Sequence, residues 1–314
     1  MRLDDFDPSS IDVEDQRGGA FGGTGGGLPF GLGGGRLGCG TLVIALIAAA
    51  VFGVNPLQLI GALDQGGQSG GQVGGMLPGQ GGTLADGAPR AGKTAAESCT
   101  IDEASRQSCN ALSSLNKTWE PIFRQSNVAF ARPKLVFYSR QGNSGCGAAQ
   151  SAMGPFYCPS DRGIYLDTDF YRELEQRFGA SGDFARDYVI AHEYGHHIQN
   201  LLGLSDQVHR AQQQAGTEAA ANRLSVRLEL QADCYAGVWA AKNRDRIEPG
   251  DLQEGLTAAH QIGDDTLMKG AGQRPMEEAF THGSSAQRME WLKRGLESGN
   301  EDACDTFADL RRGG

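Results

Sequence analysis

The sequence predicts an α+β protein, mostly α, in which one transmembrane helix precedes a single domain with a small sheet. Long stretches of the chain carry apolar residues at three- and four-residue steps, which is the helical period. Two short runs rich in β-branched and aromatic residues, 134–139 and 163–167, are typical of strands. One uncharged apolar segment, 37–63, stands apart from the rest of the chain. The residues that follow, 96–314, suffice for one domain with a sizeable core.

Residues 1–36 combine an acidic start with a run that is mostly glycine. A segment of this composition cannot bury enough apolar surface to offset the entropy lost on ordering. We therefore expect a disordered tail, and the alternative is an arm that binds a partner.

Residues 37–63 are expected to form the transmembrane helix, with the densest apolar run at 42–52. A cleaved secretory signal is the rival interpretation. However, the region before the apolar run is longer than a usual signal provides, and no A-x-A-like site follows closely. Cys39 precedes the apolar run, which argues against a lipoprotein cleavage site. An uncleaved single-pass anchor is favoured.

The charges that flank this segment predict its orientation. Arg2, Arg17 and Arg36 lie before it, and no lysine or arginine follows it until Arg90. The positive-inside tendency then places the N-terminus in the cytoplasm. Residues 64–95 are rich in glycine and glutamine and are expected to be a flexible tether.

The cysteines indicate an oxidising compartment, because an even number of them follows the tether. Proximity in sequence suggests two local pairs and one long-range pair, although six cysteines allow many pairings. Zinc ligation by cysteine is the alternative, but no C-x-x-C pair is present. The expected pairs are Cys99 with Cys109, Cys146 with Cys158, and Cys234 with Cys304.

The domain's expected elements follow from periodicity. A helix at 111–126 precedes the two strands, and short helices or helical patterns follow them. The central helix begins at Ser181 or Asp183, either of which can cap it, and ends before Gly203. The remaining helices are expected at 170–178, 217–241, 251–262 and 285–296.

The central helix carries the pattern His192-Glu193-x-x-His196. Two imidazoles four residues apart stand on one helical face, about 5–6 Å apart at Cβ, so both can reach one metal ion. Glu193 lies on the same turn and can take a proton from water at that ion. Gly195 costs helix propensity, which suggests that another backbone or a ligand comes close there. The pattern can also arise by chance, so a further ligand is needed to support it.

Glu229 and Asp233 supply the missing element on the helix at 217–241, where they share one face. Glu229 can complete the metal site while Asp233 accepts a hydrogen bond from the far nitrogen of a ligand histidine. Asp264 and Asp265 are alternatives to Glu229, but neither has a helical partner four residues on.

This arrangement resembles the gluzincins, in which the third zinc ligand is a glutamate on a second helix. More narrowly, the chain resembles the membrane-anchored neutral zinc metallopeptidases predicted in bacteria, over roughly residues 95–312 and more loosely before them. The resemblance implies a zincin-like domain, one Zn²⁺ ion, and a peptide or protein substrate held along the edge strand of the sheet. It also implies a protein of the bacterial cytoplasmic membrane with its domain in the periplasm. The motifs that carry it are 154–159, 165–167, 192–199, 229–237 and 281–288.

Three further residues have open roles. His282 precedes a helix start and resembles an element found after the third ligand in related membrane metallopeptidases; it either donates a hydrogen bond to the oxyanion or is structural. Arg288 orients Glu229 or a substrate carboxylate, or forms a structural salt bridge. His197 points about 100° away from His196 on the helix and is expected to be a packed or surface residue.

The expected function is that of a zinc-dependent endopeptidase acting outside the cytoplasmic membrane. His192, His196 and Glu229 would hold Zn²⁺, Glu193 would accept the proton of the attacking water, and Asp233 would fix a ligand imidazole. One alternative is a zinc-binding scaffold or envelope assembly factor without turnover, and another is a membrane-tethered binding protein with an accidental motif. Nucleic-acid binding is disfavoured by a net charge of -10 and the lack of a basic cluster.

Overall fold

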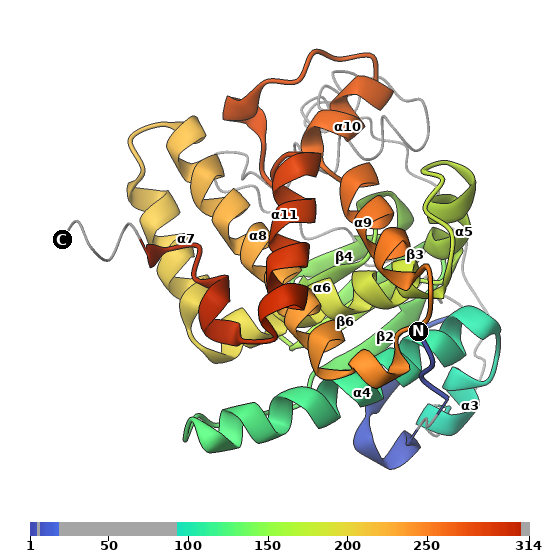
Figure 1. The fold of residues 1–314 in the computed structure, drawn as a ribbon. Helices are drawn as coiled ribbons and strands as arrows, with labels where there is room; N and C mark the ends of the chain where they lie inside the picture. Colours follow the sequence, from blue (N-terminus) through green and yellow to red (C-terminus); the bar gives the residue numbers. More distant parts are fainter. Residues whose placement is uncertain (5–6, 19–92, 309–314) are drawn as a thin grey trace, which may run out of the picture.

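The computed structural model describes residues 1–4, 7–18 and 93–308, which form a mostly helical α+β fold (Figure 1). This agrees with the expected fold class. The expected transmembrane segment 37–63 and nearly all of the tether 64–95 lie outside the described residues. Among the helices that the structure does describe, none combines the length and hydropathy needed to span a bilayer.

The sheet has four strands in the order β1-β2-β6-β5. The strands β1, β2 and β6 run parallel to one another, and the short β5 pairs antiparallel with β6 at the edge. Residues of β2 and β6 are buried on both faces, which is why these runs contain no alternating polar positions. The bounds are β1 (Asp12–Asp15), β2 (Lys134–Tyr138), β5 (Phe156–Cys158) and β6 (Gly163–Asp167).

The chain between β2 and β5 forms a separate hairpin, β3 (Gln141–Ser144) with β4 (Gly147–Gln150). The helices expected from periodicity are all present, and their ends lie close to expectation except for the start of the helix expected at 111–126. The larger helices are α4 (Glu103–Gln125), α6 (Asp183–Leu201), α7 (Leu204–Gln214), α8 (Glu218–Lys242), α9 (Asp251–Gln261) and α11 (Ser285–Ser298). The shorter ones are α3 (Ala95–Cys99), α5 (Asp169–Gln176) and α10 (Asp264–Gly270), with 3-10 turns η1 (Pro8–Ser10), η3 (Ser151–Met153), η4 (Arg244–Arg246), η5 (Glu277–Ala279) and η6 (Glu301–Cys304).

Local chemistry explains where two helices, α4 and α6, begin. The helix α4 begins at Glu103, earlier than expected, because the Asp102 carboxylate caps it by accepting from the Ser105 amide. The small polar residues after Asp102 gave too weak a pattern to reveal this start. The helix α6 has Gly182 at its N-cap, so neither Ser181 nor Asp183 takes that position. Gly203 follows its end in the left-handed conformation, as expected, with φ 68°.

The N-terminal segment (residues 1–4 and 7–18) is ordered, unlike the expected disordered tail, whereas residues 19–36 of that tail lie outside the described residues. Its strand β1 adds to the sheet beside β2, and the side chains of Met1, Leu3 and Ile11 are buried. Arg17 donates to the Asp15 carboxylate at 2.9 Å and to a backbone carbonyl of α3 at 3.1 Å. The expectation failed because the composition was averaged over the whole of residues 1–36, which hides a short segment that finds its partners far along the chain.

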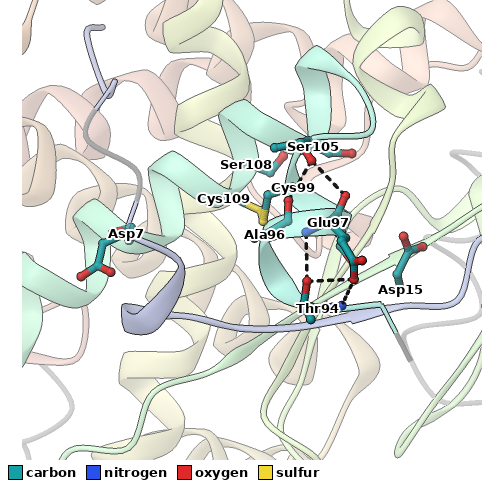
Figure 2. The surroundings of a disulfide bond; sticks show 12 residues. Asp7, Asp15, Thr94, Ala96, Glu97, Cys99, Ser105, Ser108 and Cys109 are labelled. Atoms are coloured by element: carbon teal, nitrogen blue, oxygen red, sulfur yellow. Dashed lines mark hydrogen bonds between the residues drawn. A yellow bond between two sulfur atoms is a disulfide. The ribbon is translucent and has the colours of Figure 1, made fainter. Parts of the chain in front are cut away.

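The three expected disulfides are confirmed, with S–S distances of 1.99, 2.08 and 2.00 Å. Cys99–Cys109 joins α3 to α4, and Figure 2 shows it beside the capping box in which Thr94 and Glu97 exchange hydrogen bonds. The end of the expected tether, from Lys93 onward, therefore belongs to the fold. Cys146–Cys158 ties the hairpin to β5, and Cys234–Cys304 ties α8 to η6.

Candidate metal centre and active site

The helices α6 and α8 approach closely at Gly195. A Cβ atom at Gly195 would lie 2.8 Å from the Cα atom of Ala232 and 2.9 Å from its carbonyl oxygen, closer than packed atoms allow. Glycine is therefore required at this point of α6, as its position inside the motif suggested. The close approach lets side chains from both helices reach one common point.

Three candidate ligands meet there, His192 and His196 from α6 and Glu229 from α8. The Nε2 atom of His192 lies 3.1 Å from Oε2 of Glu229, and the Nε2 atom of His196 lies 3.4 Å from Oε1 of the same carboxylate. The three donor atoms lie within 4.8 Å of one another. Two imidazole nitrogens and one carboxylate are the donor set of a catalytic zinc site. The residues present therefore fit the ion that the motif implies.

The charge of this cluster also fits a divalent cation. Burial raises the pKa of Glu229, but His196 and His282 outweigh burial and hold that pKa well below its usual range. Glu229 is thus an anion although its side chain is largely buried. A divalent cation held by neutral imidazoles could take over the role of positive partner for this carboxylate.

Asp233 fixes the orientation of His192 by binding Nδ1, the ring nitrogen that does not face Glu229. The Nδ1 atom of His192 donates to Oδ1 of Asp233 at 2.7 Å, which leaves Nε2 to face Glu229. Tyr188 donates its hydroxyl to the same carboxylate oxygen at 2.6 Å. Arg288 binds Asp233 through two nitrogens, each at 3.0 Å, and its side chain is almost fully buried. Asp233 therefore takes the position expected of it.

Arg288 resolves one of the open alternatives. Its guanidinium donates to Asp233, to the Tyr188 hydroxyl and to the Ile262 carbonyl. The buried salt bridge is thus the geometry found, and Arg288 orients the residue behind His192. Of the two carboxylates on α8, it is Asp233 and not Glu229 that Arg288 binds directly.

Glu193 lies on the cleft side of α6 and is nearly buried. Burial raises the pKa of Glu193, and the neighbouring His192 and His196 oppose the rise only in part. A raised carboxyl pKa brings the group closer to neutral pH, where it can both accept and return a proton.

His282 comes from the loop before α11 and lines the same cleft. Asp264 orders this loop by accepting three consecutive backbone amides, those of Thr281, His282 and Gly283, at 2.7, 2.7 and 3.0 Å. Its other oxygen lies 3.3 Å from Nδ1 of His282. Asp264 is therefore a support for His282 and not a third ligand. The other rejected alternative, Asp265, accepts from the amide and hydroxyl of Ser285.

A cleft of about 490 Å³ opens over these groups. The edge strand β5 contributes Phe156 and Tyr157 to its border, where the resemblance places a substrate-holding strand. Its walls are mostly apolar. They include Phe170, Phe178, Val189, Ile262 and Leu267.

His197 is a packed residue, one of the two expected outcomes. Its Nε2 atom donates to the Ala131 carbonyl at 2.7 Å, so its Nδ1 atom accepts from the Tyr157 hydroxyl at 3.0 Å. Asn200 donates to that hydroxyl at 2.9 Å. Sequence reasoning missed this contact, which fixes β5 on the helix that carries the ligands.

A second acidic group, Asp183 with Asp251 and Glu254, also brings its carboxylates within 4.8 Å of one another. The α-amino group of Met1 lies in this group, 2.7 Å from Asp183 and 3.0 Å from Asp251. A cation of the chain itself thus neutralises these acids.

Two similar proteins come from distant bacteria. The Escherichia coli (strain K12) "Uncharacterized protein YpfJ" is 49% identical over 208 residues, which are 66% of this chain and 72% of that protein. The Mycobacterium tuberculosis (strain ATCC 25618 / H37Rv) "Uncharacterized protein Rv2575" is 45% identical over 212 residues, which are 63% of this chain and 69% of that protein. No solved structure matches the chain.

A protein family described as "Putative neutral zinc metallopeptidase" matches residues 5–307. The match includes β1 as well as α6 and α8, the two helices that carry the candidate ligands. The His-Glu-x-x-His helix, the glutamate opposite it and a match over nearly the whole chain lead to one conclusion: the chain belongs to this zinc metallopeptidase family.

Proposed function

We propose that this protein is a zinc-dependent endopeptidase that hydrolyses peptide bonds of proteins or peptides. The observation that carries the proposal is the convergence of His192, His196 and Glu229 at the floor of a cleft that also contains Glu193. A metal site that only stabilises a fold is usually closed by four protein ligands. Here three ligands face an open cleft, which is the arrangement of a catalytic site.

In this mechanism His192, His196 and Glu229 would hold the zinc ion. Zinc in such a site supplies Lewis acidity, which polarises a carbonyl oxygen and makes water a stronger acid. Glu193 accepts the proton of the attacking water and then delivers it to the leaving amine. Burial raises the pKa of Glu193, which makes its carboxylate a stronger base toward the attacking water.

His282 is the candidate for stabilising the oxyanion. Asp264 engages its Nδ1 side and orders the surrounding backbone, so Nε2 is the atom that can donate to a carbonyl oxygen in the cleft. The same carboxylate favours the protonated imidazole, which is the stronger donor. This geometry supports the oxyanion role among the two alternatives for His282.

The substrate is proposed to be an extended peptide with apolar side chains. The edge strand β5 borders the cleft, and an unpaired strand edge can hold a peptide through backbone hydrogen bonds. The apolar walls would exclude water from bound side chains, which favours substrates with large hydrophobic residues.

The experiment uses the full chain, a broad peptide library and elemental analysis. We expect one zinc ion per wild-type chain and measurable hydrolysis. Glu193→Gln should keep the zinc and lower turnover by about 10²–10⁴-fold, the usual contribution of a positioned acid-base group. His192→Ala should lose the metal. Glu173→Gln is the matched control, because Glu173 lines the same cleft away from the ligands.

The same measurement distinguishes the endopeptidase from the main alternative, a zinc-binding scaffold without turnover. A wild-type protein that binds zinc but cleaves no peptide in the library would favour the scaffold. Full hydrolysis by Glu193→Gln would remove Glu193 from its role.

The proposed location of the domain is outside the cytoplasm. Three disulfides support this, because such bonds form and persist in oxidising compartments. The test is the redox state of Cys99, Cys146 and Cys234 in protein whose free thiols are alkylated as the cells are lysed. Free thiols at these positions would contradict the location.

A further inference from the structure

His196 is held by a different kind of partner than His192. Its Nδ1 atom lies 2.9 Å from Oε1 of Gln199, one turn further along α6. An amide oxygen only accepts hydrogen bonds, so Nδ1 must carry a proton, and Nε2 is the ring nitrogen that can bind the metal. The tautomer of His196 thus depends on which end of the Gln199 amide faces the ring.

The surrounding carbonyl groups decide that orientation. The Nε2 atom of Gln199 donates to the backbone carbonyl of Leu228 at 2.7 Å and to Oε1 of Gln231 at 3.1 Å. If the Gln199 amide were turned around, its oxygen would face the Leu228 carbonyl, and two acceptors would oppose each other. Leu228 immediately precedes Glu229, so Gln199 also ties α6 to α8 beside the third ligand.

Gln231 is oriented in the same way. Its Nε2 atom donates to the backbone carbonyl of Cys304 at 3.0 Å, which leaves its oxygen for Gln199. Cys304 belongs to η6 and is bonded to Cys234 of α8, and both cysteines are fully buried. The disulfide therefore fixes the carbonyl at the end of a chain of hydrogen bonds that begins at His196.

We propose that Gln199 is a positioning residue for the metal site: with Gln231 and the disulfide-anchored Cys304 carbonyl, it sets the tautomer and orientation of His196. This inference rests on the proposed zinc site. It assigns Cys234–Cys304 a role in holding the ligand geometry as well as the fold. Breaking any link loosens the same imidazole, with less effect the farther the link lies from it.

The test measures zinc affinity by competition with a chelator, together with the ¹⁵N chemical shifts of the His196 ring in the zinc-loaded chain. Gln199→Leu should weaken zinc binding by about 10–100-fold, the usual effect of removing the partner of a ligand histidine. Gln231→Leu and the pair Cys234→Ala with Cys304→Ala should weaken it less. Gln253→Leu, on the exposed side of α9, is the matched control and should change nothing.

The ring shifts provide a readout that a purely structural role would not move. They should show Nδ1 protonated and Nε2 bound to the metal in the wild type, and a mixture of the two ring orientations in Gln199→Leu. Wild-type affinity and shifts in both Gln199→Leu and Gln231→Leu would overturn the inference. Should Gln199→Leu fail to fold, Gln231→Leu alone decides. A wild-type chain that binds no zinc would instead defeat the proposed function.

The contacts of the N-terminal segment also bear on membrane topology. The N-terminal segment is hydrogen-bonded into the sheet through β1, and Gln16 exchanges two hydrogen bonds with the backbone of Asn143 in the hairpin, at 2.9 Å each. Ser10 and Ser113 of α4 are buried with their hydroxyl oxygens 2.8 Å apart. A bilayer cannot lie between groups that share hydrogen bonds.

We infer that the N-terminal segment and residues 93–308 lie on the same side of the membrane. The expected orientation, with the N-terminus in the cytoplasm and the domain outside, separates them and is incompatible with β1. Whatever path the chain takes between Gly18 and Lys93, it begins and ends in one compartment.

Cysteine cross-linking in the full chain tests this inference in a Cys39→Ser background. The pair Ser10→Cys with Ser113→Cys should form a disulfide in the membrane fraction, detected by mass spectrometry of the joined peptides. The matched pair Ser9→Cys with Ser113→Cys should not, because Ser9 is exposed and faces Asp7.

Labelling of intact cells supplies the second measurement. A membrane-impermeant maleimide should react equally with Ser9→Cys and with Gln253→Cys, both exposed positions. Labelling of Gln253→Cys alone, with no cross-link at Ser10, would overturn the inference.

Discussion

The two ligand histidines are one helical turn apart, yet opposite kinds of group hold them. Behind His192 lies an ionic cluster, in which the Asp233 carboxylate is bound by the Arg288 guanidinium and the Tyr188 hydroxyl. Behind His196 lies the neutral amide of Gln199. Both partners make Nδ1 the protonated nitrogen, so both leave Nε2 for the metal. Acceptor geometry therefore sets the tautomer of each ring, whereas the folding free energy that each acceptor contributes depends on whether it is charged.

The two histidines should differ most in how much folding stability is lost when the acceptor of each Nδ1 atom is removed. Asp233→Leu leaves the Arg288 guanidinium buried without its carboxylate, which should cost about 3–5 kcal/mol of folding stability. Gln199→Leu leaves no unpaired charge and should cost about 1–3 kcal/mol. Urea unfolding in the presence of a chelator measures both values without the metal. Equal losses would show that charge does not distinguish the two sides.

A smaller effect is expected when both partners of the ionic pair are replaced. Asp233→Leu combined with Arg288→Met removes the orphaned charge, so the double variant should be about 1–3 kcal/mol more stable than Asp233→Leu alone. Its zinc affinity should stay low, because His192 has lost its acceptor. The double-mutant cycle, followed by urea unfolding and chelator competition, separates stability from metal binding. Additive losses would argue against a coupled pair.

The smallest effect is expected from Tyr188→Phe. The change removes one donor to Asp233, while Arg288 and His192 still bind the carboxylate. Stability should fall by about 1 kcal/mol, as for a single buried hydrogen bond. Zinc affinity should change little. A large loss of affinity would mean that the hydroxyl, and not the guanidinium, holds Asp233 in register.

The sequence was sufficient for the parts of the site that repeat at helical spacing. His192, His196 and Glu193 follow from one motif, and Glu229 with Asp233 follows from a second pair four residues apart, so both pairs had to share a helical face. The three disulfides could be paired because two of them close short loops. Gly195 could be interpreted because a glycine inside a helix signals a close neighbour.

The parts that escaped prediction depend on contacts between distant segments. Asp264 binds three amides of a loop that lies further along the chain, and no local pattern encodes that geometry. Gln199 lies three residues after His196, and this spacing was the available signal, but glutamine is common on helices. The strand β1 was missed because four residues give little periodicity and their partner strand is far away in sequence.

The strand β1 also bears on how the chain should be produced. Asp12 pairs with Lys134, so the first strand leaves the ribosome long before its neighbour in the sheet has been synthesised. A fragment trimmed to start at residue 93 would fold with the outer edge of β2 bare. Largely apolar edges of that kind attract strands from other molecules, and such a fragment should aggregate where the full chain stays dispersed.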